Sequence, residues 1–242
     1  MTETHDQPVL LAAPAKLTVS LRVVGVRDDG YHLIDAEMVT VNLFDELVVD
    51  SSRTGLEVVR DGVVTAGGPD DLVLRALDLT GRRAGVRLTK RIPVGAGLGG
   101  GSADAAAILR WAGYDDIAGA TELGADVPFC VIGGRARVSG IGEKVEELPY
   151  VDRTFTLSTP PIHCSTPVVY RTWDELGGPV GDGGNDLEPA ALAAVPELGR
   201  ARDELGAATG QRPRLAGSGS TWFVEGAYPG PGRRVVRTIP AT

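Results

Sequence analysis

The chain has 242 residues, of which 43% are hydrophobic and 23% charged, and its formal net charge is -8. This composition indicates a soluble globular protein of one or two domains, and the negative charge disfavours nucleic acid as its main partner. No apolar run approaches the ~18 residues of a membrane helix, and the acidic start MTETHDQPVL does not resemble a secretion signal, so we expect a cytoplasmic protein without a membrane partner.

Predicted strands dominate the chain as far as residue 94. Between residues 17 and 23 hydrophobic side chains alternate with mostly polar ones, which is the period of a strand with one buried face. Pro93 limits how far a central strand could extend at the end of this part. The elements expected here are a strand at 17–23, a turn at 27–32, a strand at 37–52 interrupted at Asp45, a hairpin at 55–64, a helix at 70–85 and a strand at 86–94.

A helix is predicted directly after a glycine-rich run. Residues 103–113 are rich in alanine and leucine, the best helix formers, with Ser102 as the N-cap and Gly113 as the stop. Strands and helices without a regular βαβ rhythm predict an α+β protein whose two domains meet near residues 145–155. The later elements expected are a weaker helix within 117–133, strand and turn at 135–149, a strand and a proline-punctuated loop at 153–173, a flexible turn at 177–184, helix at 185–207 and two strands around a glycine turn at 212–227.

Lysine is scarce, because only three of the 24 basic residues are lysines. Lys16 precedes an alternating strand and Lys90 directly precedes the glycine run. A lysine at such a position in an arginine-rich chain indicates a positive charge placed beside a phosphate or a carboxylate. The alternative is a lysine at the end of a strand that points into water. The two cysteines, Cys130 and Cys164, lack the spacing of metal ligands and are expected to be buried free thiols.

The glycine run RIPVGAGLGGGSA allows several interpretations. A Walker loop is excluded because no lysine follows the glycines. A dinucleotide fingerprint matches at Gly95, Gly97 and Gly100, with Asp115 further on, but some 90 residues precede it and such a motif normally opens its domain. The third interpretation is a backbone cradle for the phosphates of a nucleotide at the start of the following helix, with Ser102 reaching a phosphate oxygen or Mg2+. The fourth is a loop that serves only close packing.

Three segments resemble the sequence motifs of the GHMP kinase superfamily in their expected order, namely PAKL, PVGAGLGGGSA and LAGSGSTWF. More narrowly, DDGYHLIDAE, LGADVPFC and NDLEP resemble the 4-diphosphocytidyl-2-C-methyl-D-erythritol kinase family of the non-mevalonate isoprenoid pathway, and the similarity spans about residues 12–225. The resemblance implies an N-terminal ribosomal-protein-S5-like α/β domain that binds ATP, at residues 1–150, and a shortened ferredoxin-like domain at residues 151–242.

The resemblance also implies a reaction, the ATP-dependent phosphorylation of the 2-hydroxyl group of a cytidine diphosphate sugar alcohol. Asp126 would accept the hydroxyl proton, and Lys16 beside it would stabilise the carboxylate and the developing charge. Without Lys16 and the glycine run, an aspartate before Val-Pro would be as typical of a helix cap or turn as of a catalytic base. Mg2+ is expected with ATP, but no carboxylate cluster in the sequence identifies its ligands.

The remaining site residues follow from motif positions. Taken singly, His32 would be a surface residue, Tyr170 a core residue and the GSGS segment a hairpin turn. The residues expected at the nucleotide are Pro93, Gly95, Gly97, Leu98, Gly99, Gly100, Gly101, Ser102 and Ala103. Those expected at the acceptor are Tyr31, His32 and Tyr170 around the cytosine ring, Thr166 nearby, and Gly217 and Ser218 of the third motif.

The chain departs from the family pattern in several places. Thr18 and Asp71 stand where asparagine is usual, the helix after residue 72 looks short, and the sequence after residue 225 lacks the pattern of a final helix. These departures motivate one alternative, a catalytically weak nucleotide-binding homologue. A second alternative is a GHMP kinase with another small alcohol as acceptor, as in homoserine or mevalonate kinases. Both a monomer and a homodimer remain open.

Overall fold

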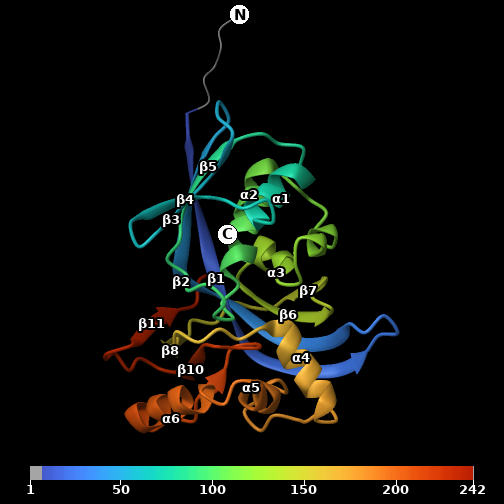
Figure 1. Cartoon of the computed structure of the whole chain (residues 1–242), viewed down its shortest axis with the longest axis vertical. Coiled ribbons are helices and arrows are strands. Elements are labelled where there is room, and N and C mark those ends of the chain that lie inside the picture. The colour runs from blue at the N-terminus through green and yellow to red at the C-terminus, as the bar shows by residue number, and fades with distance from the viewer. Residues whose placement is uncertain (1–6, 242) are drawn as a thin grey trace, which may run out of the picture.

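The computed structural model describes residues 7–241, so the first six residues of the acidic N-terminal segment lie outside the described part. The first half of the chain builds a seven-stranded sheet in which β1 pairs with β2 and the other strands follow the order β4-β3-β5-β2-β6-β7. Its strands are β1 (Val9–Val26), β2 (His32–Asp50), β3 (Gly55–Arg60), β4 (Val63–Ala66), β5 (Gly85–Thr89), β6 (Arg135–Gly140) and β7 (Lys144–Glu147). The long β1–β2 hairpin reaches from the top of the molecule into its lower part (Figure 1).

Strand β1 begins at Val9, earlier than the prediction at residue 17, because it runs through Pro14. Proline removes one hydrogen-bond donor from a sheet, and here the pairing register with β2 shifts between Pro14 and Lys16. Strand β2 is not interrupted at Asp45, which is fully buried within it. The predicted break at Asp45 is wrong, because this buried carboxylate is paired with Lys90 and with the amides of Arg91 and Ile92.

Three helices lie on one face of this sheet (Figure 1), namely α1 (Leu72–Leu79), α2 (Gly100–Ala112) and α3 (Val127–Ile132), with a short 3-10 turn at Gly119–Glu122. Alanine side chains of α2 are buried against β1, and their small size lets the helix approach the sheet closely. Helix α1 is shorter than the predicted 70–85, because Thr80 ends it and Gly81 continues with a φ of 64°.

The second half of the chain builds a four-stranded antiparallel sheet of order β11-β8-β10-β9. Its strands are β8 (Thr154–Ser158), β9 (Arg214–Leu215), β10 (Trp222–Glu225) and β11 (Arg233–Arg237), and its helices are α4 (Thr166–Glu175), α5 (Glu188–Ala194) and α6 (Leu198–Thr209). The rings of Phe155 and Phe223 meet edge to face in its core, with centroids 5.7 Å apart.

Two predictions in this half were wrong, and proline explains both. Residues 166–175 form helix α4 instead of a loop, because Pro167 lies in the first turn, where its missing N–H costs nothing. The predicted helix at 185–207 is divided into α5 and α6 around Val195 and Pro196. Strand β11 was not predicted.

The mixed helices and sheets confirm the predicted α+β class. The division into domains at 1–150 and 151–242 stays a prediction, which we propose because each sheet uses strands from one side of that boundary. Among residues 7–241, none of the helices combines the length and the apolar character needed to cross a membrane.

Candidate active site

The glycine run forms the connection between β5 and α2 and has the geometry of a cradle. Gly95, Gly97 and Gly99 have φ values of 68°, 77° and 67°, a region that favours glycine. A Cβ on Gly97 would lie 2.5 Å from the carbonyl oxygen of Ala216, and one on Gly99 would lie 2.7 Å from Cγ of Lys16. Glycine is therefore required at both positions by close approach as well as by conformation.

Helix α2 begins three residues earlier than predicted, with Gly99 as its N-cap and without a side-chain cap. The prediction of Ser102 as the N-cap is therefore wrong, because Ser102 already lies in the first turn of the helix. The first amides of a helix have no partner inside it, so they remain available to an anion. Residues 93–102 all line one cavity, while Ala103, also predicted at the nucleotide, is 1% exposed and belongs to the core.

Lys16 and Asp126 form an ion pair, with Nζ and Oδ2 3.0 Å apart. Lys16 follows the register shift in β1 and is 5% exposed, and its Nζ also donates to the hydroxyl of Thr18 at 3.1 Å. Asp126 occupies the N-cap position of α3, yet its side chain makes no capping hydrogen bond. Asp126 therefore stands at a helix cap, as one interpretation predicted, but its carboxylate is directed to Lys16 and not to the helix amides.

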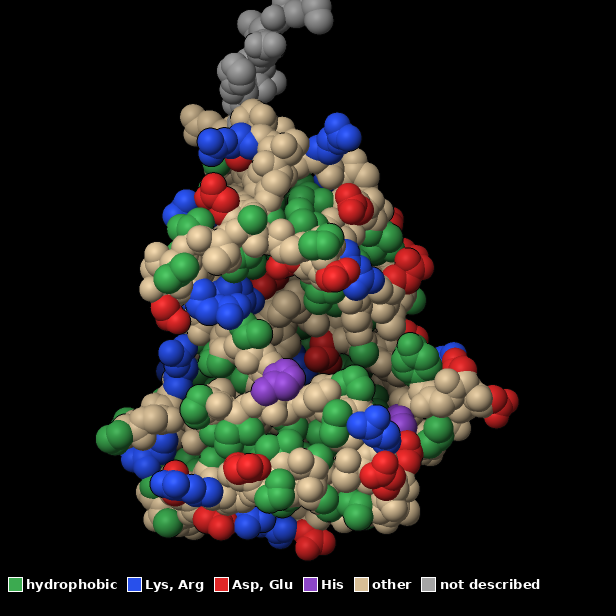
Figure 2. Space-filling view, in the orientation of Figure 1, with side chains coloured by type: hydrophobic (Ala, Val, Ile, Leu, Met, Phe, Trp, Pro, Cys, Tyr) green, Lys and Arg blue, Asp and Glu red, His purple; other side chains and the backbone are tan. Residues whose placement is uncertain are grey.

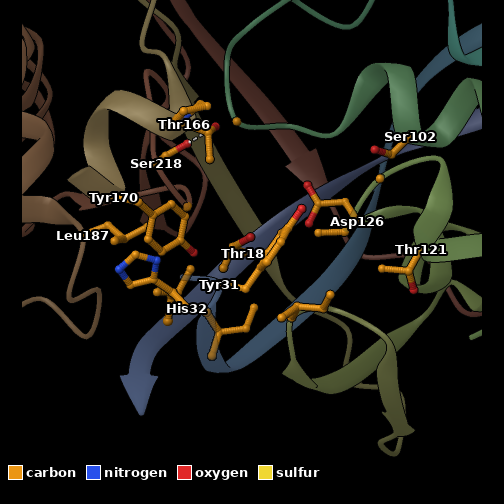
Figure 3. A pocket seen from close by; sticks show the side chains of 18 of the residues that line it. Thr18, Tyr31, His32, Ser102, Thr121, Asp126, Thr166, Tyr170, Leu187 and Ser218 are labelled. Carbon is orange, nitrogen blue, oxygen red and sulfur yellow. Dashed lines mark hydrogen bonds between the residues drawn. The ribbon is translucent and has the colours of Figure 1, made fainter. Parts of the chain in front are cut away.

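The far end of the site is aromatic (Figure 3). His32, at the start of β2, has its ring centroid 4.7 Å from that of Tyr170 and 5.5 Å from that of Trp173. Nε2 of His32 lies 2.8 Å from a carboxylate oxygen of Asp174 on α4. Burial, followed by the charge of Asp126, raises the pKa of the Tyr170 hydroxyl. Tyr31 is 59% exposed, and the guanidinium of Arg27 lies over its ring, 5.8 Å from the centroid.

The third glycine segment reaches the site from the second sheet. Gly217 has a φ of 60°, and a Cβ placed on it would lie 3.7 Å from the hydroxyl of Thr18. The hydroxyl of Ser218 lies 2.8 Å from that of Thr166 at the start of α4. The backbone of Ala96 accepts a hydrogen bond from Thr221 at 3.2 Å, which joins the two glycine segments directly.

These groups surround one cavity of about 820 Å³ on a face of the molecule that is hollowed between its two parts (Figure 2). The cavity adjoins the glycine cradle, because Gly97 and Ser102 line both. The predicted residues that the structure brings together around the larger cavity are Lys16, Tyr31, His32, Gly97, Ser102, Asp126, Thr166, Tyr170, Gly217 and Ser218. Asp115 lines neither cavity, so the dinucleotide interpretation gains no support.

Comparisons with known proteins agree on one family. The model for the N-terminal domain of GHMP kinases matches residues 71–134. A 4-diphosphocytidyl-2-C-methyl-D-erythritol kinase of Granulibacter bethesdensis is 36% identical over 98% of this chain and 91% of its own length. One from Ruegeria pomeroyi is 38% identical over 91% of this chain and 88% of its own length. The chain belongs to the 4-diphosphocytidyl-2-C-methyl-D-erythritol kinase family.

Solved structures agree with this membership. A crystal structure of 4-(cytidine 5'-diphospho)-2C-methyl-D-erythritol kinase superposes with a TM-score of 0.74 at 31% identity, covering 95% of this chain and 98% of the other. A homoserine kinase from Cytophaga hutchinsonii, 18% identical with a TM-score of 0.57, covers 100% of this chain and 97% of its own, and shares the fold. The predicted GHMP kinase fold is thereby confirmed.

Within this kinase family, the two departures from the usual pattern have local explanations. Thr18 accepts the hydrogen bond from Lys16, so it takes part in holding the ion pair. Asp71 is the N-cap of α1, where its carboxylate accepts from the amide of Val73 at 2.9 Å, and it lines the glycine cavity. Both residues are thus used by the fold of this kinase.

Lys90 lies beside carboxylates, as one of the two interpretations predicted. Its Nζ bonds Asp104 at 2.5 Å and contacts Asp45, and all three side chains are at most 7% exposed. Asp45 also accepts the backbone amides of Arg91 and Ile92, which lead into the glycine cradle. Burial, together with the charge of Asp45, raises the pKa of Asp104 to about 8 despite Lys90. The cluster ties β2, β5 and α2 together beneath the cradle.

Sequence reasoning about this kinase missed some cavity residues. Glu122, Arg171 and Asp174 line the larger cavity but belong to no quoted motif role. Arg171 follows Tyr170 in α4, and recognition of that helix would have placed both near the cavity. Cys130 and Cys164 are free and buried, as predicted.

Proposed function

We propose that this chain transfers the γ-phosphoryl group of ATP to the 2-hydroxyl of 4-diphosphocytidyl-2-C-methyl-D-erythritol. The observation that carries the proposal is the position of the Lys16–Asp126 pair in the larger cavity, which shares Gly97 and Ser102 with the glycine cradle. A phosphate held by the cradle and a hydroxyl held in the larger cavity would therefore meet beside a carboxylate.

The glycine cradle would bind the phosphates of ATP. Amides at the start of α2 and the positive end of its dipole favour negative charge there. A Cβ on Gly97 would meet the backbone of Ala216, and one on Gly99 would meet Lys16, so both positions keep a bare backbone beside the cavity. ATP brings the phosphoryl group, and Mg2+ neutralises its triphosphate. Among residues 7–241 no cluster of three or more acidic, histidine or cysteine side chains has metal-binding geometry, so we assign Mg2+ no protein ligand.

Asp126 would act as the base toward the acceptor. As the oxygen of the 2-hydroxyl forms its bond to the γ-phosphorus, the bond from that phosphorus to the oxygen of ADP breaks, and the hydroxyl proton passes to the Asp126 carboxylate. Lys16 holds the carboxylate in place before transfer, and its ammonium group stabilises the charge that develops on the phosphoryl oxygens. The low exposure of Lys16 strengthens this interaction because little water screens it.

The aromatic end would bind the cytosine ring. Tyr170 offers a ring face fixed by His32, and Tyr31 is exposed enough to cover the opposite face of a base. His32 would bond the edge of the base through its other ring nitrogen, since Nε2 faces Asp174. This end distinguishes the proposal from a GHMP kinase for a small alcohol, which would need no aromatic subsite.

The cavity also holds a cation for the diphosphate of the acceptor. Three of its four acidic lining residues, Asp29, Asp126 and Asp174, already pair with Arg27, Lys16 and His32, and the fourth is Glu122. Arg171 lines the same cavity, and no ion pair of its guanidinium is found among residues 7–241. A diphosphate carries two or more negative charges and needs such a partner, so we assign Arg171 to it.

A coupled assay of ADP release tests the proposal. Wild type should release ADP only when the cytidine diphosphate acceptor is present, and Asp126→Ala should lose at least a hundredfold in kcat because the base is gone. A matched control is Glu122→Gln, which changes another carboxylate of the same cavity and should stay within threefold of wild type. Wild type that releases ADP no faster than Asp126→Ala would contradict the proposal and leave the two alternatives, a catalytically weak nucleotide-binding homologue and a GHMP kinase with another small alcohol as acceptor.

A further inference from the structure

The NDLEP segment is buried between the two parts of the site, and the proposed function gives it no role. Asn185 and Asp186 are 2% and 3% exposed, in the turn that leads into α5. Polar side chains this deeply buried are normally held by hydrogen bonds, so their partners show what the segment holds together.

Asp186 holds the segment to β1, the strand that carries Lys16. Its carboxylate accepts the amide of Val23 at 3.0 Å and the guanidinium of Arg22 at 2.6 Å. The backbone joins there as well, because Leu21 donates to Gly184 and accepts from Asp186, both at 2.9 Å. Asp186 therefore fixes this turn against the sheet of the first half of the chain.

Asn185 holds a different partner, the third glycine segment. Its Nδ2 donates to the carbonyl of Leu215 at 2.9 Å and to that of Gly217 at 2.7 Å, and its Oδ1 accepts the amide of Leu187 at 3.0 Å. Both hydrogens of the amide thus point at carbonyl oxygens. No other side chain of similar size and shape offers two donors and one acceptor in this arrangement.

Gly217 lies close to Lys16 of the catalytic pair. A Cβ on Gly217 would lie 3.8 Å from Nζ of Lys16, and Ser218 follows it with its hydroxyl on Thr166. The position of this segment relative to Lys16 is therefore set by Asn185, which extends from a turn that the backbone hydrogen bonds of Leu21 already hold to β1.

We infer that Asn185 is a positioning residue of the kinase reaction, which holds the Gly217–Ser218 segment at the distance from Lys16 that phosphoryl transfer requires. The inference rests on the proposed function, because it assigns the segment a place beside the transferred phosphate. Asn185 itself touches no substrate, and it acts through the backbone of residues 215–217.

Two substitutions of equal size separate positioning from stability. Asn185→Asp replaces the donating amide by an oxygen that faces two carbonyl groups. Asp186→Asn keeps one acceptor and changes only the contacts to Arg22, Val23 and Gly181, so the bonds from Asn185 to the glycine segment stay in place. Both change one buried atom in the same turn, so both should lower the thermal unfolding midpoint. Only Asn185→Asp should displace the glycine segment, and kcat should then fall about 10- to 100-fold, as expected for misplaced groups at a reacting centre.

The experiment measures kcat with the cytidine diphosphate acceptor and, without any substrate, the hydrogen exchange of the peptide covering residues 214–221. Asn185→Asp should show the loss in kcat and faster exchange in that peptide, and Asp186→Asn should keep kcat within threefold of wild type. Asn185→Ser, which replaces the two amide donors by a single hydroxyl donor and adds no charge, should behave as Asn185→Asp does and replaces it if that variant does not fold.

Two results would overturn the inference. One is a kcat within twofold of wild type in the folded Asn185 variant, and the other is an equal loss of kcat in Asp186→Asn. If wild type itself transfers no phosphate to the acceptor, the proposed function fails, while the exchange of residues 214–221 still decides whether Asn185 holds the segment.

Discussion

Asp104→Asn should make the stability of the protein less dependent on pH. Asp104 is 2% exposed and has a pKa of about 8, raised from 3.8 by burial and by the charge of Asp45. Between these two values the folded chain binds a proton that the unfolded chain releases, so wild type loses stability as pH rises through this window. Asparagine is neutral throughout and can still accept the hydrogen bond from Lys90.

The magnitude follows from the change in pKa. A rise from 3.8 to about 8 corresponds to roughly 6 kcal/mol at about 1.4 kcal/mol for each unit, which is the upper limit of the effect. We therefore expect the free energy of unfolding of Asp104→Asn, relative to wild type, to increase by several kcal/mol between pH 5 and pH 8.

Urea unfolding at several pH values between 5 and 8 measures this difference. The same substitution at Asp78, an exposed residue of α1, shows the effect of removing a charge away from the cluster. A difference between Asp104→Asn and wild type that stays constant from pH 5 to pH 8 would refute the reasoning, because Asp104 would then not bind its proton more tightly in the folded state.

Three further predictions concern the substrates. Tyr170→Ala should raise the acceptor KM about tenfold in steady-state assays and leave the ATP KM unchanged, because stacking of one base on an aromatic ring contributes ~1–3 kcal/mol to binding. An unchanged acceptor KM would place the cytosine elsewhere. Arg171→Ala should also raise the acceptor KM in steady-state assays. Arg171→Lys should bring that KM part of the way back to the wild-type value, since lysine restores the positive charge but not the planar guanidinium group. Gly97→Ala should abolish ADP binding in calorimetry, because its Cβ would lie 2.5 Å from the carbonyl oxygen of Ala216, and normal ADP affinity would contradict the cradle.

Site residues could be predicted from the sequence where they belong to short motifs. Lys16, Asp126 and the glycine run each have a residue type that their role demands, and the structure brings them together. Helix α4 was missed because Pro167 was taken as a loop signal, although proline is tolerated in a first turn. Asp45 was taken as a break because its partners, Lys90 and the amides after it, are about 45 residues away in the chain. Long-range pairing of this kind leaves no local pattern.

The role inferred for Asn185 could not be predicted from the sequence for the same reason, because it depends on long-range pairing. Its partners at Leu215 and Gly217 are 30 and 32 residues away, and their carbonyl groups belong to the backbone, which any sequence provides. A motif whose side chains bind distant backbone groups can therefore be seen in a sequence only as an unexplained group of polar residues. The fold shows which backbone groups Asn185 binds, and the inferred role follows from those contacts.

Phosphorus NMR of the reaction mixture tests the central claim most directly. With ATP and the cytidine diphosphate acceptor, wild type should produce the signal of a new phosphate monoester, formed on the 2-hydroxyl group, together with the signals of ADP. Asp126→Asn, which keeps the shape of the side chain but cannot take the proton, should not produce it on the same time scale. A monoester formed equally fast by Asp126→Asn, or its absence with wild type, would contradict the account.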